Sequence, residues 1–299
     1  MESNGAENTY MPKNMSVIYN PNNKLIEKRD VHKILTKANI KNRVNDISIW
    51  QKAFTHSSYS KKSKKNRKYN GFLEKLNITD EDEQDKDYSN CLEIQEDSSE
   101  RLEWLGDAIL QAVSASYLWT RFSKQDEGFL TKLRSKLVKT EGCSKYAKYY
   151  DFEKHLIISK HIEENCNGRN NLHILEDAFE AFIGAMYVDF GINNESTGYN
   201  VCRKFIVYTF ENCGIDFTDL IMNDDNYKDQ LMRHYQKKFN GKFPIYEEES
   251  YNEENKLFTM YVVHPGTKKS IGKGTAQSKK KAEQFAAKKA LQYFKIPVK

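Results

Sequence analysis

The sequence lacks the long apolar runs and the paired cysteines that mark several classes of protein. None of its apolar runs reaches the roughly 20 residues of a membrane-spanning helix, and its first residues, MESNGAENTYMPKN, lack the apolar core of a secretory signal. The five cysteines are odd in number and show no C-x-x-C spacing, which argues against a disulfide framework or a zinc site. We therefore expect an intracellular protein, cytoplasmic or nuclear, with no membrane partner.

Charge is unevenly distributed, although the net charge is only +5. Residues 266–299 hold ten lysines and one acidic residue, Glu283, whereas residues 80–97 hold nine carboxylates and one lysine. Residues 61–68, KKSKKNRK, fit a nuclear address or a solvated loop equally well. The basic C-terminal end suits a polyanion, because lysines near phosphates release condensed counterions, but on charge alone a solvated surface is the simpler explanation.

Apolar residues recur at three- and four-residue steps from Ser99 to about Tyr208. This period is shown by Leu102, Leu105, Ile109 and Val113, and again by Ala178, Phe182, Ala185 and Met186. It is typical of amphipathic helices, and the same stretch holds no convincing hairpin signal. The sequence therefore predicts an all-α domain in which Leu102, Leu105 and Ile109 are buried.

The pattern changes towards the C-terminus. An amphipathic helix at 226–239 is followed by three strand-like segments at 243–251, 256–264 and 268–276, and by a last helix at 278–294. The predicted fold class is thus an all-α domain followed by a small α-β-β-β-α domain.

Composition sets the predicted domain boundaries. Residues 1–28 are polar and without apolar period, which predicts a flexible N-terminal tail. Residues 29–215 form the helical domain, with a long charged insertion at 60–98 in which residues 72–78 could make one helical turn. Residues 224–296 form the small second domain.

Two pairs of carboxylates lie on two of the predicted helices. In SERLEWLGDAIL, where Ser99 is the expected N-cap, Glu103 and Asp107 are four residues apart and project from one helix face. In HILEDAFEAFIGAMYVD, Asp177 and Glu180 are three residues apart. One such pair is by itself more often a solvated helix face than a site.

Two glycines inside these helices, Gly106 and Gly184, favour a site. Each costs about 1 kcal/mol in a helix interior, which indicates a close packing contact or access for a ligand. Two acidic pairs on apolar helices suit hard, oxygen-preferring cations such as Mg²⁺. Such ions promote phosphodiester hydrolysis by activating water, holding the phosphate and offsetting charge on the leaving 3′ oxygen.

Three motifs, in order, resemble the ribonuclease III family. ERLEWLGDAIL (100–110) resembles E-R-L-E-F-L-G-D-A-V-L, AFTHSSY (53–59) resembles A-L-T-H-R-S-Y, and EDAFEAFIGAMYVD (176–189) resembles D-x-x-E-A-x-x-G-A-x-Y-x-D. The resemblance covers most of residues 30–210. It implies a catalytic domain that dimerises, with two metal sites that each cut one strand of double-stranded RNA and leave short 3′ overhangs.

Carried over by position, the resemblance names the catalytic and metal-binding residues. They are Glu103, Asp107, Asp177 and Glu180, with Glu100 in a supporting position. The implied cofactor is Mg²⁺, which Mn²⁺ can replace.

The sequence also departs from the family pattern. Trp104 stands where the family has the phenylalanine that packs across the dimer interface, so Trp104 is the expected interface residue and its socket must differ in shape. Ser57 replaces an arginine, which puts in doubt any polar contact of that arginine. The stretch from Tyr59 to Glu100 far exceeds the short link of simple bacterial members.

Lys279, Lys280 and Lys281 fall in the first turn of the last predicted helix, where the helix macrodipole disfavours cations. A phosphate bound between these lysines and the backbone N–H groups would reverse that cost. Residues 272–291 resemble the pattern G-x-G-x-x-x-S-K-K-x-A-E-Q-x-A-A-x-x-A-L of the double-stranded-RNA-binding domain. The expected RNA-binding residues are the three lysines and Lys273.

One departure from the family pattern would weaken RNA binding by the C-terminal domain. NEEN (252–255) replaces the family's G-P-x-H loop and would place two glutamates near RNA. We expect His56 to satisfy a structural hydrogen bond rather than perform chemistry. His173, four residues before Asp177, could approach the site but is not needed there.

The sequence thus predicts a homodimeric endoribonuclease that hydrolyses double-stranded RNA with metal-activated water. The alternative is a non-catalytic double-stranded-RNA-binding protein that sequesters RNA, and a weaker one is a structural ribosome-associated relative. Retention of the four carboxylates favours the enzyme, because a pure binder has no need of a crowded acidic site.

Overall fold

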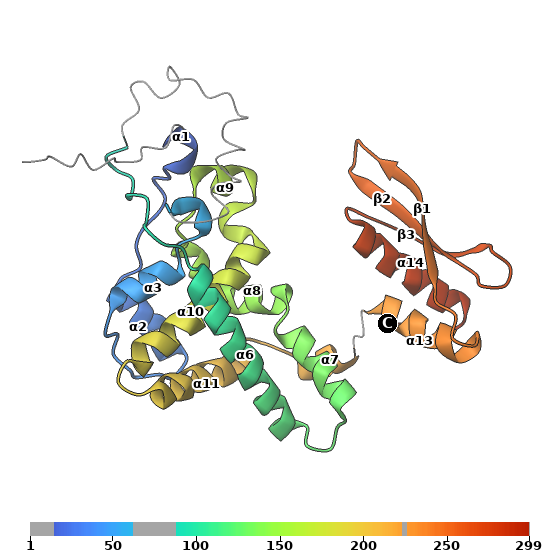
Figure 1. The fold of residues 1–299 in the computed structure, drawn as a ribbon, viewed down its shortest axis with the longest axis horizontal. Coiled ribbons are helices and arrows are strands. Elements are labelled where there is room, and N and C mark those ends of the chain that lie inside the picture. The colour runs from blue at the N-terminus through green and yellow to red at the C-terminus, as the bar shows by residue number, and fades with distance from the viewer. Residues whose placement is uncertain (1–14, 62–87, 223–225, 299) are drawn as a thin grey trace, which may run out of the picture. The chain divides into compact units, whose positions relative to one another are not determined.

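The computed structural model describes residues 15–61, 88–222 and 226–298, and the chain divides into two compact units, Met1–Ile215 and Asp216–Lys299 (Figure 1). The α-helices are α1 (Met15–Ile18), α2 (Lys28–Lys37), α3 (Ile47–Ala53), α6 (Glu100–Arg121), α7 (Glu127–Leu137), α8 (Thr140–Tyr149), α9 (Lys160–Asn165), α10 (Leu172–Gly191), α11 (Glu195–Asn212), α12 (Phe217–Met222), α13 (Tyr227–Lys238) and α14 (Lys279–Tyr293). The 3₁₀ helices are η1 (Ser57–Tyr59), η3 (Phe152–Lys154) and η4 (Gly168–Asn170), and the strands are β1 (Ile245–Asn252), β2 (Leu257–Val263) and β3 (Ser270–Ala276). Within these ranges, no helix combines the length and the apolar character that crossing a membrane requires.

Helix α10 forms the centre of the first unit. It packs against α3, α6, α8 and α11, and most of its residues are buried, as expected for a helix that is apolar around its circumference. Phe182 on α10 contacts the rings of Trp50 and Phe152 at 4.8 Å between centroids and that of Phe205 at 5.5 Å. The prediction of an all-α first domain is confirmed.

The expected burial of α6 holds only in part. Leu102 and Ile109 are buried, but Leu105 is half-buried and lines an open groove beside Trp104. The prediction for Leu105 was wrong because the apolar stripe on this helix is wider than the face that α10 covers.

The predicted flexible tail, residues 1–28, is packed in its second half. Within that stretch, Ile18, Asn20, Asn23 and Ile26 are buried. Asn20 and Asn23 both donate side-chain hydrogen bonds to the carbonyl of Ile158, at 3.1 and 2.9 Å. Asparagine-rich sequence looks polar, yet here its amides satisfy a buried carbonyl.

Residues 62–87 lie outside the described part of the chain. They include most of the predicted insertion, its possible helical turn at 72–78 and nearly all of the basic run. The described end of the insertion joins the helical unit: the Tyr59 hydroxyl donates to the Leu92 carbonyl at 2.6 Å, and Gln95 pairs with Ser60 in a short parallel bridge.

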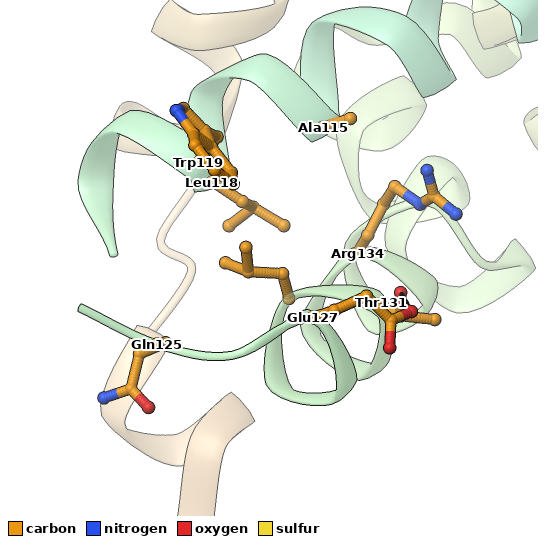
Figure 2. A pocket seen from close by; sticks show the side chains of 8 residues that line it. Ala115, Leu118, Trp119, Gln125, Glu127, Thr131 and Arg134 are labelled. Carbon is orange, nitrogen blue, oxygen red and sulfur yellow. Dashed lines mark hydrogen bonds between the residues drawn. The ribbon is translucent and has the colours of Figure 1, made fainter. Parts of the chain in front are cut away.

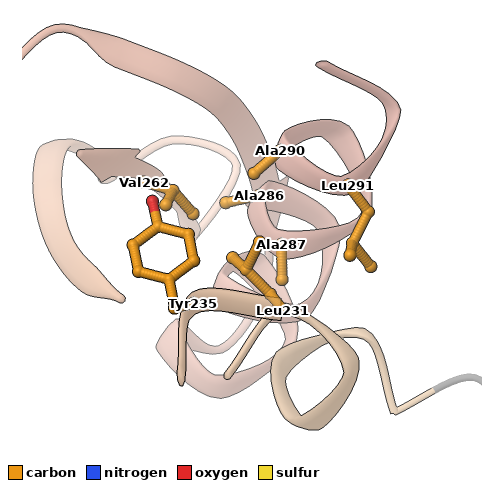
Figure 3. Close-up of a cluster of buried hydrophobic side chains, with 7 residues drawn as sticks. All are labelled: Leu231, Tyr235, Val262, Ala286, Ala287, Ala290 and Leu291. Atoms are coloured by element: carbon orange, nitrogen blue, oxygen red, sulfur yellow. The ribbon is translucent and has the colours of Figure 1, made fainter. Parts of the chain in front are cut away.

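The second unit is a three-stranded antiparallel sheet in the order β1-β2-β3, which packs against α13 and α14. Its core holds Leu231, Tyr235, Val262, Ala286, Ala287, Ala290 and Leu291 (Figure 3). Gly272 and Gly274 on β3 face α14 so closely that a Cβ would lie 2.3 Å from the Ala286 carbonyl oxygen and 2.4 Å from that of Ala282. The α-β-β-β-α prediction is confirmed.

Candidate active site and RNA-binding surface

Helices α6 and α10 cross in direct backbone contact at two glycines (Figure 1). A Cβ on Gly106 would lie 1.7 Å from the carbonyl oxygen of Glu180, and one on Gly184 would lie 2.1 Å from that of Leu102. Any larger side chain would push the helices apart. The glycines thus mark a close packing contact, and this contact brings the two predicted acidic pairs side by side.

Glu180 lies among the carboxylates of both helices. Its side chain is half-buried, and its pKa is raised to about 8, first by burial and then by repulsion from Asp107, Glu176, Asp177 and Glu103. Repulsion of this kind requires that these groups lie near one another. The structure therefore gathers all four predicted carboxylates at one crossing rather than on separate surfaces.

Glu176 is a fifth acidic group that lies outside the predicted set. It lies one turn before Glu180 on α10 and raises the pKa of Glu180. His173 Nδ1 lies 3.3 Å from Glu176 Oε2. This exposed histidine therefore contacts the acidic cluster through Glu176. The four-residue spacing of Glu176 and Glu180 was the available signal for it.

The donor set fits a hard divalent cation. All five groups offer carboxylate oxygens, which Mg²⁺ and similar ions prefer. Among the described residues, no three aspartate, glutamate, histidine or cysteine side chains converge tightly enough to form a ready-made metal site. The fit to a cation therefore rests on the kind of donor atom, and the raised pKa of Glu180 reflects first its burial and then the repulsion from its acidic neighbours.

Neighbouring side chains fix parts of the cluster. Gln111 Nε2 donates to Asp107 Oδ1 at 3.1 Å, one turn further along α6. Cys143 on α8 is fully buried close to the cluster, and burial, followed by the proximity of Glu180 and Glu176, raises the pKa of its thiol well above the ordinary value.

The start of α6 differs from the sequence expectation. Ser99 occupies the N-cap position, but it has helical backbone angles and makes no side-chain cap hydrogen bond. Its N–H instead donates to the Thr55 carbonyl at 2.8 Å, while Ser98 Oγ donates to Glu100 Oε2 at 3.2 Å. The helix start is therefore anchored by the THSSY segment. There the Ser58 N–H donates to His56 Nδ1 at 3.1 Å, so the imidazole caps η1 as a structural group, as expected.

An apolar groove flanks α6 beside the carboxylates. It encloses about 980 Å³, and its apolar lining comprises Ile49, Leu102, Trp104, Leu105 and Val188. Trp104 is 77% exposed and Val188 is 37% exposed. The exposed tryptophan thus adds to the apolar surface on this side of α6.

A second groove, of about 240 Å³, lies between the C-terminal half of α6 and α7 (Figure 2). Leu118 and Trp119 line it from α6, and Thr131 and Arg134 from α7. Trp119 lies twelve positions after Asp107, which corresponds to about 18 Å along the helix. This groove is therefore not part of the carboxylate site.

In the second unit, Lys279, Lys280 and Lys281 form the exposed first turn of α14. Ser278 caps this turn by accepting from the Lys281 N–H at 3.4 Å. Lys273 lies elsewhere: it stands between Gly272 and Gly274, which face α14, so its side chain points to the opposite face of the sheet, where it pairs with Glu249. The structure brings the three helix lysines together but does not bring Lys273 to them.

Comparisons with known proteins match both units. Residues 100–191 match the model of the ribonuclease III domain, and residues 227–294 match that of the double-stranded RNA binding motif. Ribonuclease 3 of Lactobacillus acidophilus is 32% identical over 274 residues, which cover 90% of this chain and 100% of the relative.

Two further similarities were found. A probable ribonuclease 3 of Acanthamoeba polyphaga mimivirus is 32% identical over 298 residues, which cover 98% of this chain, but the chain spans only 50% of that relative's length. The solved nuclease domain of ribonuclease III from Campylobacter jejuni is 26% identical, with a TM-score of 0.44, covering 62% of this chain and 98% of that one. From the two matched domains and the full-length match to a bacterial relative, the chain belongs to the ribonuclease III family of metal-dependent endoribonucleases that cut double-stranded RNA.

Proposed function

We propose that the chain hydrolyses double-stranded RNA at the crossing of α6 and α10, with Glu103, Asp107, Asp177 and Glu180 as the catalytic and metal-binding residues. The observation that carries this proposal is the gathering of all four carboxylates around Glu180. Mg²⁺ is the proposed cofactor, with Mn²⁺ able to replace it, because the donors are oxygens only. A cation held by these carboxylates would supply an activated water and would offset the charge on the leaving 3′ oxygen.

The chain's own groups hold and prepare the site. Burial and four neighbouring carboxylates raise the pKa of Glu180 to about 8, so this group would hold a proton near neutral pH and would lose it on binding a cation. Gln111 orients Asp107 by donating to one of its oxygens. The glycine contact between the helices sets the separation of the two acidic pairs.

The proposal includes a homodimer formed through the catalytic unit. Trp104 neighbours Glu103 on α6 and is 77% exposed beside the apolar groove. If Trp104 of each copy packs into the groove of the other, the exposed apolar surface is covered in both and two sites act on one duplex. Each site would then cut one strand, leaving short 3′ overhangs.

We assign the grip on the duplex to the first turn of α14. Its N-terminal N–H groups, of which that of Lys281 also donates to Ser278 Oγ, and the lysines Lys279, Lys280 and Lys281 favour a phosphate at that position. Lys273 faces the other side of the sheet and would not reach the same phosphates.

A cleavage assay on a labelled RNA duplex tests the proposal. We expect the full chain to cut both strands at staggered positions in Mg²⁺ or Mn²⁺, and to leave a DNA duplex and single-stranded RNA intact. Removal of divalent cations should stop cutting without releasing the RNA duplex. Binding of the duplex with no cutting in either metal would overturn the proposal and favour a protein that sequesters RNA.

A further inference from the structure

We infer that Glu248 competes with RNA phosphates for Lys279 and thereby limits how tightly the C-terminal unit holds a duplex. The inference rests on the proposed function, in which the first turn of α14 binds the RNA backbone. Its physical basis is an ion pair of 2.6 Å between Glu248 Oε2 and Lys279 Nζ.

The strand register explains why a residue of β1 reaches this helix. Glu248 lies opposite Met260 on β2, and Met260 lies opposite Gly274 on β3. Directly opposed residues share a face of a sheet, and Gly274 faces α14. Glu248 therefore projects to the side of the sheet that carries α14. Glu249, the extra residue of a β-bulge, pairs instead with Lys273 on the outer face.

Glu248 supplies the kind of charge that the helix start favours. Three successive lysines at the positive end of a helix dipole are stabilised by an anion, and phosphate is the anion expected from RNA. In the structure a carboxylate of the same chain pairs with the first of these lysines. Duplex phosphates that approach Lys279 must therefore separate it from Glu248, and the freed carboxylate then repels them.

Both members of this ion pair are exposed to solvent. Lys279 is 57% exposed and Glu248 36% exposed. Ion pairs as exposed as this one are weak, since water screens them. A duplex with many phosphates can therefore displace Glu248, which makes the glutamate a modulator of affinity rather than a block.

Duplex affinity of charge-neutral variants of the full chain tests the inference. Binding of an RNA duplex is measured at low salt without divalent cations, so that the RNA is not cut. Glu248→Gln should tighten binding by about threefold or more, because it removes the competitor and the repulsion while preserving the size of the side chain. Thermal melting of each variant checks that it is folded.

Glu247→Gln is the matched control. It removes the same charge from the adjacent position, but Glu247 lies opposite Tyr261 and hydrogen-bonds its hydroxyl, away from Lys279. A second control is Glu248→Gln in the background of Lys279→Gln. There the gain should fall to that of Glu247→Gln, because the competition needs the lysine.

Each outcome decides one claim. Equal tightening by Glu247→Gln and Glu248→Gln would mean that only the overall charge matters, and would overturn the inference. So would unchanged binding of Glu248→Gln, or a gain that persists without Lys279. If wild type and every variant fail to bind the duplex, the proposed RNA grip itself fails and the inference falls with it.

Discussion

Glu180 is the residue at which the structure adds most to the motif. The sequence placed it in an acidic pair with Asp177, whereas the structure shows it half-buried among four other carboxylates, with a pKa raised to about 8. A carboxyl group with such a pKa is mostly protonated at neutral pH unless a cation binds beside it.

This protonation makes divalent-cation binding depend on pH. Below pH 8 Glu180 carries a proton that must leave when the cation binds, so affinity should rise with pH. The rise should approach tenfold per pH unit between about pH 6 and pH 8 and flatten above it, since one proton is released per site. Titration calorimetry with Mg²⁺ or Mn²⁺ at several pH values measures it, and proton release appears as a dependence of the heat on the buffer.

Glu180→Gln provides the control for this prediction, because glutamine has no proton to lose in this range. Its residual affinity should be lower and nearly independent of pH. A wild-type affinity that does not change between pH 6 and pH 8 would mean that the cation binds without Glu180.

At other residues the structure differs from what the sequence pattern predicts. The four carboxylates followed from a spaced motif. Glu176 lies four residues before Glu180 on the same helix, but it falls outside the carboxylates that the family motif names. Serine is a common N-cap residue, yet the Ser99 side chain makes no cap hydrogen bond. The Ser99 N–H instead donates to the Thr55 carbonyl, and this contact anchors the start of α6. Leu105 follows the apolar period, but no described element covers it fully, so it borders the groove of Trp104.

At the scale of elements, the site depends on the contact of α6 with α10. Gly106→Ala would place a methyl group 1.7 Å from the Glu180 carbonyl oxygen, so the helices must separate. We expect a net loss of about 2 kcal/mol in the free energy of unfolding, because overpacking outweighs the gain in helix propensity. Urea denaturation measures it.

Gly128→Ala is the matched control for this change. Position 128 lies in α7, and a Cβ there would come no closer than 3.6 Å to Asp126 Oδ1. Its stability should equal or slightly exceed that of the wild type. A Gly106→Ala variant that is as stable as Gly128→Ala would contradict the close contact.

The start of α14 is the second element on which the proposed function depends. Lys279→Glu combined with Lys280→Glu should weaken duplex binding by about tenfold or more and flatten its salt dependence, because phosphate contacts are lost. Lys268→Glu combined with Lys269→Glu is the matched control, because these exposed lysines lie in the turn between β2 and β3 and the net charge changes by the same amount. This control variant should weaken duplex binding much less. Binding isotherms at several salt concentrations measure both, and an unchanged slope would count against the phosphate contacts.

At the scale of the whole molecule, the order of the two folds could be predicted because both carry periodic patterns and ordered motifs. Two features could not. The packing of residues 15–28 depends on the buried Ile158 carbonyl, which lies more than a hundred residues away in sequence and accepts from Asn20 and Asn23. The pairing of Glu248 with Lys279 depends on the register of β1 and on the bulge at Glu249, which the alternation of residue types does not reveal.

The proposed homodimer is a property of the whole molecule as well. Trp104→Glu should raise the dimer dissociation constant by about 30-fold or more, because a charge would enter the centre of an apolar interface. Analytical ultracentrifugation over a range of concentrations measures it. Tyr293→Glu alters an aromatic residue of similar exposure in the C-terminal unit and should leave the dimer intact. A wild-type chain that is monomeric at all concentrations would refute the dimer.

Single-turnover cutting of an RNA duplex by Glu180→Gln, with binding followed in parallel, is the decisive measurement for the proposed catalytic site. We expect the rate to fall by about 10³-fold or more while duplex affinity and melting temperature stay close to those of the wild type, because the metal site would supply several kcal/mol of transition-state stabilisation. Glu195→Gln, an exposed substitution at the start of α11, should cut at the wild-type rate. Cutting by Glu180→Gln within about tenfold of the wild type would contradict the assignment of catalysis to the crossing of α6 and α10.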